Sequence, residues 1–411
     1  MGNQVSTKIQ TRARSEERAH NINLQSLLRD AMRLAYVTLT DLYAYREEIK
    51  PAIDKITKNT EKIVRIKVHQ AKIYEDATRR YLGKVKQLGS ISNPIHETPV
   101  IEFTDADKLD VDGSGFRREY YSVYFRECIA NMFEGNGRQM IPRKDCTKKD
   151  ELKALGIAIV ECILNGDCGF PYLNTAVYKK IIGCDSDTID KNLRNTDIPD
   201  GEVRIIAEQI SNATTQDELS EVVSSNEASF LNYVGWPAGQ KMTMSNRDVL
   251  LQCITRWYII DHRVNEIEQI RQGLNYMGFL DTIKSNPWFE PLFVYSEQYC
   301  ITASYMKDKL NPVLNKLEPI NEKEAACKKF AAECIQSIDD QQARLLFAFI
   351  TNLNDPPIVE EAIDVRFNRH RPESTLPESQ TCLNVLLLPL GNKDVDSFKD
   401  AFWTAIVGQT Q

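Results

Sequence analysis

The sequence predicts an α+β fold in which helices outnumber strands. Apolar residues recur at three- and four-residue steps in many segments, which is the pattern of amphipathic helices. Two short apolar runs, at residues 99–103 and 385–388, predict short buried strands instead. The 411 residues are sufficient for two or three structural units, and a composition of 42% hydrophobic and 27% charged residues is typical of a soluble globular protein.

Charge is unevenly distributed along the chain. Residues 1–96 contain 18 Lys or Arg against 10 Asp or Glu, a net charge of +8, so the remainder carries −15 within a total of −7. An acidic main part argues against nucleic acid as a principal partner.

Cysteine and histidine usage argues against a metal site. The 10 cysteines are scattered without a CxxC pair and the 5 histidines lie far apart, so we expect no zinc framework. The polar, basic start shows no secretory signal, and no apolar stretch is long enough to cross a bilayer. We therefore expect free thiols and a reducing, cytoplasmic compartment.

Residues 1–61 predict a helical N-terminal arm. Gly2 and Ser6 match the N-myristoylation pattern, and basic residues between positions 8 and 18 would supply a second membrane signal, which two glutamates in the same stretch weaken. The alternative is an unmodified polar start. An apolar face at residues 24–35 and a stripe of isoleucines at positions 49, 53 and 56 predict two helices, with Pro51 near a helix start. We favour a packing helix pair over a coiled coil, because clean heptads are few.

Residues 62–320 predict a mainly helical unit. A strand-like start passes into a helix with Ile73, Ala77 and Tyr81 on its apolar face, and the strand at 99–103 follows. A glycine turn at 112–115 leads into a helix with buried aromatic residues, 155–164 is a buried helix, and Gly183 ends the next one. One long amphipathic helix is predicted over 246–277, and 317–321 is a linker.

Residues 321–411 predict helices over 322–338 and 395–406, with the short strand 385–388 between them. Asn352 follows a helical stretch at a turn position, where asparagine tolerates a positive φ. Cys382 lies on a loop where proline-containing turns lead into the strand, and a loop held by rigid neighbours is a usual place for a functional residue. The alternative is a cysteine that packs as a small apolar side chain.

The string from Leu376 to Pro389 resembles the active-site segment of the HECT ubiquitin ligases. That pattern runs Leu-Pro, three residues, Thr-Cys, one residue, Asn, then an apolar strand ending in Pro, and it is met here by Leu376, Pro377, Thr381, Cys382, Asn384 and Pro389. Similar family stretches occur in order at residues 73–77, 112–121, 170–183 and 341–357. The resemblance covers residues 62–411. It implies a bilobal fold, with a large helical N-lobe at 62–320, a hinge, and a smaller α/β C-lobe at 321–411.

The resemblance implies a two-step transfer without a cofactor. Cys382 would take ubiquitin from a ubiquitin-conjugating enzyme as a thioester and pass it to a lysine of a protein substrate, while Thr381 and Asn384 would support the loop. Four positions depart from the family pattern: Ser114 and Asn352 each replace a glycine, Gln380 a histidine, and Gly408 a phenylalanine near the C-terminus.

Two alternatives to an active ligase remain. One is a catalytically weak scaffold or adaptor of the same fold at a membrane. The other is a thiol protease, which the sequence disfavours because the papain-type signature is absent and all histidines precede Cys382.

Overall fold

The computed structural model describes residues 39–57, 61–88, 95–104, 115–144, 150–199, 201–237, 239–296, 299–358, 362–381 and 383–410. The chain divides between Tyr45 and Arg46 into two units, and the contacts described below lie within the second, Arg46–Gln411. Within the described ranges, no helix combines the length and apolarity that crossing a bilayer requires.

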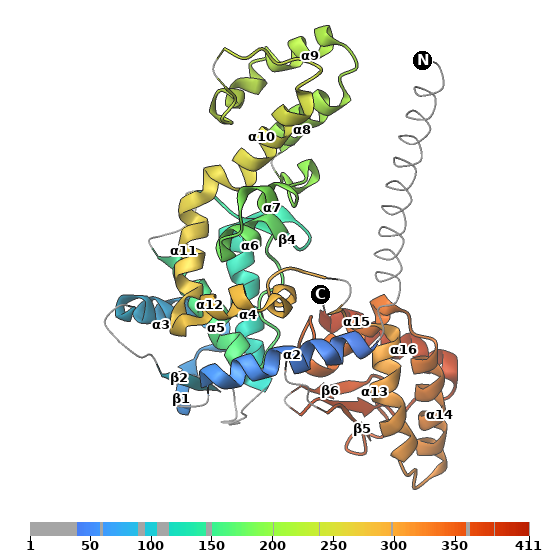
Figure 1. Ribbon diagram of the computed structural model, residues 1–411. Helices are drawn as coiled ribbons and strands as arrows, with labels where there is room; N and C mark the ends of the chain where they lie inside the picture. Colours follow the sequence, from blue (N-terminus) through green and yellow to red (C-terminus); the bar gives the residue numbers. More distant parts are fainter. Residues whose placement is uncertain are drawn as a thin grey trace, which may run out of the picture. The chain divides into compact units, whose positions relative to one another are not determined.

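Helices carry most of the described chain (Figure 1), and their bounds are α2 Leu39–Thr57, α3 Ile73–Gln87, α4 Gly115–Met132, α5 Glu151–Leu164, α6 Thr175–Ile182, α7 Ser186–Asp190, α8 Gly201–Asn212, α9 Gln216–Val223, α10 Arg247–Ile259, α11 Val264–Leu274, α12 Phe279–Ser285, α13 Ala303–Lys316, α14 Glu322–Gln336, α15 Asp340–Thr351 and α16 Val395–Thr410.

Strands form three small sheets in the described ranges, and their bounds are β1 Glu61–Val68, β2 His96–Phe103, β3 Phe133–Asn136, β4 Gln139–Pro142, β5 Asp364–Phe367, β6 Glu378–Gln380 and β7 Val385–Leu388. β1 and β2 pair in parallel, β3 and β4 form an antiparallel hairpin, and the third sheet has the order β5-β7-β6. Many helices with few, segregated strands confirm the predicted α+β class.

The helix α3 confirms the periodicity read from the sequence. Ile73, Ala77 and Tyr81 are buried along one face, and the Tyr81 ring stacks on Tyr124 of α4 at 5.6 Å between centroids. α4 buries further aromatic side chains, including Tyr120 and Tyr121, as the sequence predicted. The strand predicted at 99–103 is also present, within β2.

A pair of glycines lets α5 and α11 approach closely. A Cβ atom on Gly156 would lie 2.7 Å from the carbonyl oxygen of Ile270 and 2.8 Å from the Cα of Gly273. A Cβ on Gly273 would collide in the same way with the backbone of Lys153. No larger residue fits at either position without moving a helix.

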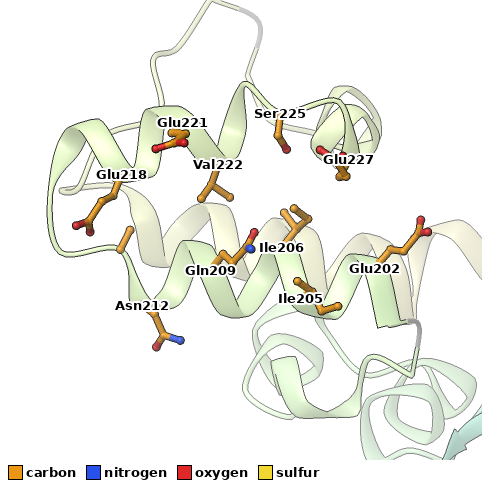
Figure 2. Close-up of a pocket in the computed structure, with 11 residues that line it drawn as sticks. Glu202, Ile205, Ile206, Gln209, Asn212, Glu218, Glu221, Val222, Ser225 and Glu227 are labelled. Carbon is orange, nitrogen blue, oxygen red and sulfur yellow. The ribbon is translucent and has the colours of Figure 1, made fainter.

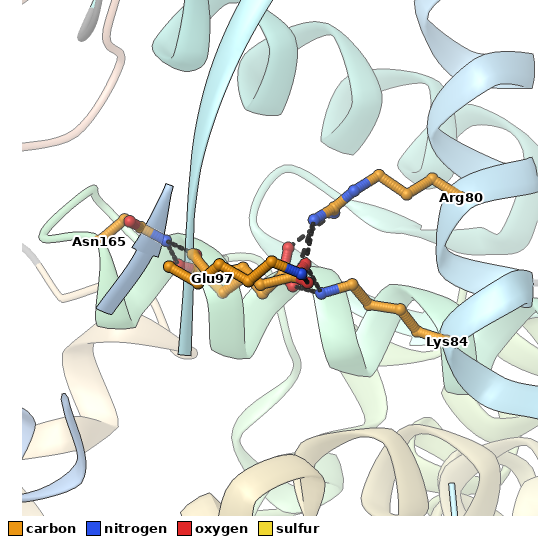
Figure 3. Close-up of polar contacts among 6 residues, drawn as sticks. Arg80, Lys84, Glu97 and Asn165 are labelled. Carbon is orange, nitrogen blue, oxygen red and sulfur yellow. Dashed lines mark hydrogen bonds and ion pairs between the residues drawn. The ribbon is translucent and has the colours of Figure 1, made fainter. Parts of the chain in front are cut away.

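A cluster of four charges lies between α3, β2 and α5 (Figure 3). Arg80 and Lys84 extend from α3; Arg80 contacts Glu161 of α5 at 2.7 Å and Glu97 of β2 at 3.2 Å, and Lys84 contacts both glutamates. Burial opposes ionisation of Glu161, yet attraction to the two cations keeps the pKa of its carboxyl below the ordinary value. Glu161, the most buried member, is thus paired with two cations, and Glu97 also contacts the exposed Lys62 at 3.9 Å.

We call helices α2–α12 with strands β1–β4 the helical part. Two of its details differ from the sequence prediction. The helix expected over 246–277 is two helices, because the chain turns at Asp261–Arg263, where the buried Arg263 donates to the carbonyl of Pro142 at 2.9 Å. Pro51 lies inside α2 rather than near a helix start. Its missing N–H removes one backbone hydrogen bond from that helix.

The helices α13–α16 surround the third sheet in what we call the C-terminal group, with α13 packed on α14, α15 and β5. The connection between α13 and α14 is non-helical, and Asn321 caps α14 by accepting a hydrogen bond from the Glu324 amide. Asn352 ends α15 with a φ of 57°, which confirms the prediction that asparagine there adopts the left-handed conformation. The buried rings of Phe398 and Phe402 confirm the apolar face of the last helix.

Candidate functional site

The loop singled out by the sequence joins β6 to β7. β6 pairs antiparallel with β7, with Gln380 opposite Val385, so residues 381–384 form the connection of a β-hairpin. β7 also pairs in parallel with β5 and is buried at three of its four positions, which confirms the predicted buried strand. Cys382 itself lies outside the described residues.

Backbone hydrogen bonds close the turn on both sides of position 382. The Leu383 amide donates to the Gln380 carbonyl at 2.9 Å, and the Asn384 amide donates to the Thr381 carbonyl at 3.4 Å. The Asn384 carbonyl in turn accepts from the Asp364 amide at the start of β5 at 3.0 Å. The turn is therefore tied to itself and to the sheet beside it.

Asn384 is the buried corner of this turn. It has a φ of 50° and only 2% of its surface is exposed. Its side-chain Oδ1 accepts a hydrogen bond from Nη1 of Arg118 on α4 at 2.7 Å, across 266 positions of sequence. Among non-glycine residues, asparagine is well suited to this left-handed conformation.

The strand beyond the turn is held by hydrogen bonds to backbone carbonyls. The Cys327 thiol of α14 donates to the Pro389 carbonyl at 3.1 Å, and the Gly391 amide donates to the Ser374 carbonyl at 2.8 Å. These contacts fix the segments that enter and leave the hairpin.

Other side chains near position 382 in sequence face outward. Thr381 is half-buried, whereas Leu383 and Leu376 are exposed apolar residues, at 59% and 47%. Gln380, which replaces the family's histidine, is exposed on β6, and His370 is exposed in the segment after β5.

Most other described cysteines are unsuited to nucleophilic chemistry. A protonated thiol attacks poorly, and burial raises the pKa of a thiol by penalising the thiolate. Burial raises the pKa to about 12 in Cys327 and to about 11 in Cys334. It also raises the pKa of the thiols of Cys128, Cys162, Cys168, Cys253 and Cys300.

A groove of about 640 Å³ lies between α8 and α9 (Figure 2). Ile206 and Val222 extend into the space between the two helices, and Ile205 adds exposed apolar surface. Acidic side chains surround this apolar floor: Glu202, Glu218, Glu221 and Glu227. This groove, which we call the α8–α9 groove, lies within residues 184–246, for which the sequence predicts no particular element.

Trp257 and Tyr258 of α10 pack within the fold. The Trp257 ring stacks on Phe230 at 5.9 Å and lies 4.9 Å from the His262 ring. Tyr258 is buried and donates to Glu134 at 3.2 Å. Neither lines the α8–α9 groove.

A second arginine links the helical part to the C-terminal group. Arg138, in the β3–β4 turn, forms an ion pair with Asp355 just after α15. Its guanidinium also lies over the rings of Tyr172, at 5.1 Å, and Tyr295, at 4.7 Å. Despite Arg138, burial raises the pKa of the Asp355 carboxyl.

Of the residues predicted to form the site, Thr381 and Asn384 lie together in the turn, and Gly2, like Cys382, lies outside the described residues. The contact between Asn384 and Arg118 was not predicted from the sequence, in which Arg118 falls within the family stretch at residues 112–121. No local pattern reveals a contact between residues so far apart in the chain.

Position 382 falls between two paired strands of a hairpin, and burial raises the pKa of most other described thiols. The family model described as "HECT-domain (ubiquitin-transferase)" matches residues 120–407, more than half of the chain. The chain therefore belongs to the HECT family of ubiquitin ligases. A search of the curated proteins finds no match.

Proposed function

We propose that the chain accepts ubiquitin on Cys382 as a thioester and transfers it to a lysine of a protein substrate. The observation that carries this proposal is the family match, which includes position 382 together with both strands of its hairpin. The protonated state of most other described thiols supports the assignment by narrowing the set of candidate nucleophiles.

The chemistry is two successive acyl transfers. The Cys382 thiolate attacks the carbonyl of ubiquitin bound to the conjugating enzyme, a new thioester forms, and the enzyme's thiolate leaves. A neutral lysine amine of the substrate then attacks that carbonyl. An isopeptide bond forms, the Cys382 thiolate leaves, and the amine gives up its proton. Neither step needs a metal or an organic cofactor.

A thioester trap tests the assignment. The purified chain is mixed with activating enzyme, a panel of conjugating enzymes, ubiquitin and ATP, and run on gels with and without reductant. We expect an adduct that reductant removes, that is absent from Cys382→Ala, and that becomes reductant-resistant in Cys382→Ser, because serine forms an oxygen ester.

Cys184→Ala is the matched control, since this described cysteine is only half-buried, and it should leave the adduct intact. No adduct with any conjugating enzyme, from a chain shown to be folded, would refute the transferase proposal and favour the scaffold alternative.

We further propose that the conjugating enzyme docks in the α8–α9 groove. The groove has an apolar floor within an acidic rim, so it suits an apolar side chain flanked by basic residues. Ile205→Glu should weaken binding of the ubiquitin-loaded conjugating enzyme at least tenfold. Val249→Glu, at a residue of similar exposure on α10 outside the groove, is the control and should not. Equal effects of the two variants in a titration would contradict this site.

The N-terminal sequence supports membrane attachment as the remaining part of the proposal. Gly2 and Ser6 match the myristoylation pattern, and the basic residues that follow would supply the second membrane signal. Mass spectrometry of the N-terminal peptide from eukaryotic cells should show a myristoyl group, and Gly2→Ala should lose both the group and sedimentation with membranes. An unmodified or acetylated Gly2 in the wild-type chain would contradict this part.

A further inference from the structure

The hydrogen bond from Arg118 to Asn384 joins a helix of the helical part to the cysteine-bearing turn. Arg118 and Asn384 are each only 2% exposed, and the Nη1–Oδ1 distance is 2.7 Å. A guanidinium has donors only, so the Asn384 amide must present its oxygen to Arg118 and turn its nitrogen away. The contact therefore fixes the orientation of the amide as well as its position.

The same residue is the point where three constraints on the turn meet. The backbone carbonyl of Asn384 accepts a hydrogen bond from Asp364 of β5, and its backbone N–H donates to Thr381. Its side chain accepts a hydrogen bond from Arg118 of α4. The connection has four residues, and this arrangement ties its first and last members. The described residues on both sides of position 382 are therefore held in place.

We propose that Arg118 is a positioning residue for Cys382, which acts by holding Asn384 and hence the turn in the conformation that accepts ubiquitin. This inference rests on the proposed function. Arg118 lies on α4, outside the C-terminal group, whereas the turn belongs to that group. An element of the helical part therefore helps to hold the turn.

The neighbouring residue Arg117 provides a matched control on the same helix. Its Nε donates to Asp167 at 3.0 Å and its Nη2 to the Asn165 carbonyl at 3.3 Å, within the helical part. Arg117→Met removes a partly buried arginine contact of similar size without touching the turn. An effect of Arg118 on folding alone would be shared by Arg117, whereas an effect on Cys382 would not.

A double-mutant cycle on the charging step tests the proposal. Single-turnover rates of ubiquitin transfer from a charged conjugating enzyme to the full chain are measured for Arg118→Met, Asn384→Gly and the double variant. Glycine retains the positive φ at position 384 and removes only the side chain. We expect each single variant to charge at least tenfold more slowly, which is about 1.4 kcal/mol of barrier.

Since Arg118 acts through Asn384, the double variant should be no slower than the slower single variant. Arg118→Lys, which keeps the charge and a donor, should recover part of the rate. Arg117→Met should charge within twofold of wild type, at an equal fraction folded. Losses that multiply in the double variant, or wild-type charging by Arg118→Met, would overturn the proposal.

Amide hydrogen exchange separates this inference from the proposed function. Exchange of the peptide covering residues 378–388 should accelerate in Arg118→Met and stay at the wild-type rate in Arg117→Met. If wild type never charges, the proposed function fails, and the role of Arg118 in positioning a reactive cysteine fails with it. Unchanged exchange in Arg118→Met beside normal wild-type charging would overturn the positioning role alone.

Discussion

Replacing Glu161 by glutamine should be one of the most destabilising isosteric changes in the helical part. The substitution keeps the side-chain volume and removes one negative charge from the cluster in Figure 3. Glu161 is only 1% exposed, so Arg80 and Lys84 lose their buried partner. Removing one partner of a buried ion pair costs about 3–5 kcal/mol.

The remaining glutamate reduces that cost and supplies the control. Glu97 stays in contact with both cations and its side chain is 21% exposed, so we expect about 3 kcal/mol for Glu161→Gln, at the lower end of the range. Glu97→Gln leaves the buried Glu161 paired with both cations and removes a charge that solvent already screens. We therefore expect it to lower the free energy of unfolding by about 1 kcal/mol. The comparison isolates the effect of burial at constant net charge.

The pH dependence of the two variants gives a second readout. The pKa of Glu161 is lowered in the folded chain, so its contribution is present above the unfolded value, near 4.5, and is lost as the pH falls through the folded value. Wild type should therefore lose stability below about pH 5. The difference in free energy of unfolding between wild type and Glu161→Gln should become smaller over the same pH range.

Urea unfolding in reductant, followed by circular dichroism at pH 7 and at lower pH, measures these differences. The m-value should stay constant if the native and denatured states keep their exposed areas. An equal or larger cost for Glu97→Gln would refute the reasoning, and so would a gap that does not change with pH.

Three further predictions follow from single contacts. Gly156→Ala should cost about 1–3 kcal/mol in urea unfolding, because its Cβ would meet the Ile270 carbonyl, whereas Gly83→Ala inside α3, with open space around it, should be neutral or stabilising by up to about 1 kcal/mol; equal effects would contradict the close approach. Asn352→Val should cost about 1–2 kcal/mol while Asn352→Gly is neutral, since only the β-branched residue opposes a φ of 57°; thermal melts that do not separate them would contradict the cap geometry. Iodoacetamide at pH 8 should leave Cys327 unmodified in the folded chain, because burial raises its pKa to about 12, and rapid labelling seen by peptide mass spectrometry would contradict its buried hydrogen bond.

Elements with a regular apolar pattern were predictable from the sequence. α3 shows its buried face at four-residue spacing, and residues 385–388 form a continuous apolar run. Asn352 was predictable because few other residues adopt a positive φ. In each case a local physical rule is enough to determine the structure.

Features set by distant contacts were not predictable. β5 and β6 have only four and three residues, too few to show an alternating pattern. The apolar stripe continues from α10 into α11, so periodicity gave no sign of the break that Arg263 stabilises. The role of Arg118 depends on a partner 266 residues away, and no local rule relates the two.

The order of strands in the third sheet also constrains when it can form during synthesis. β5 and β6 both pair with β7 and not with each other, although both precede it in the chain. A nascent chain that ends before residue 385 therefore contains β5 and β6 without the strand that both pair with, whereas the helices up to α15 have already been made. The turn at 381–384 lies between two paired strands only once β7 has left the ribosome, so a chain that ends before β7 lacks the sheet that holds this turn.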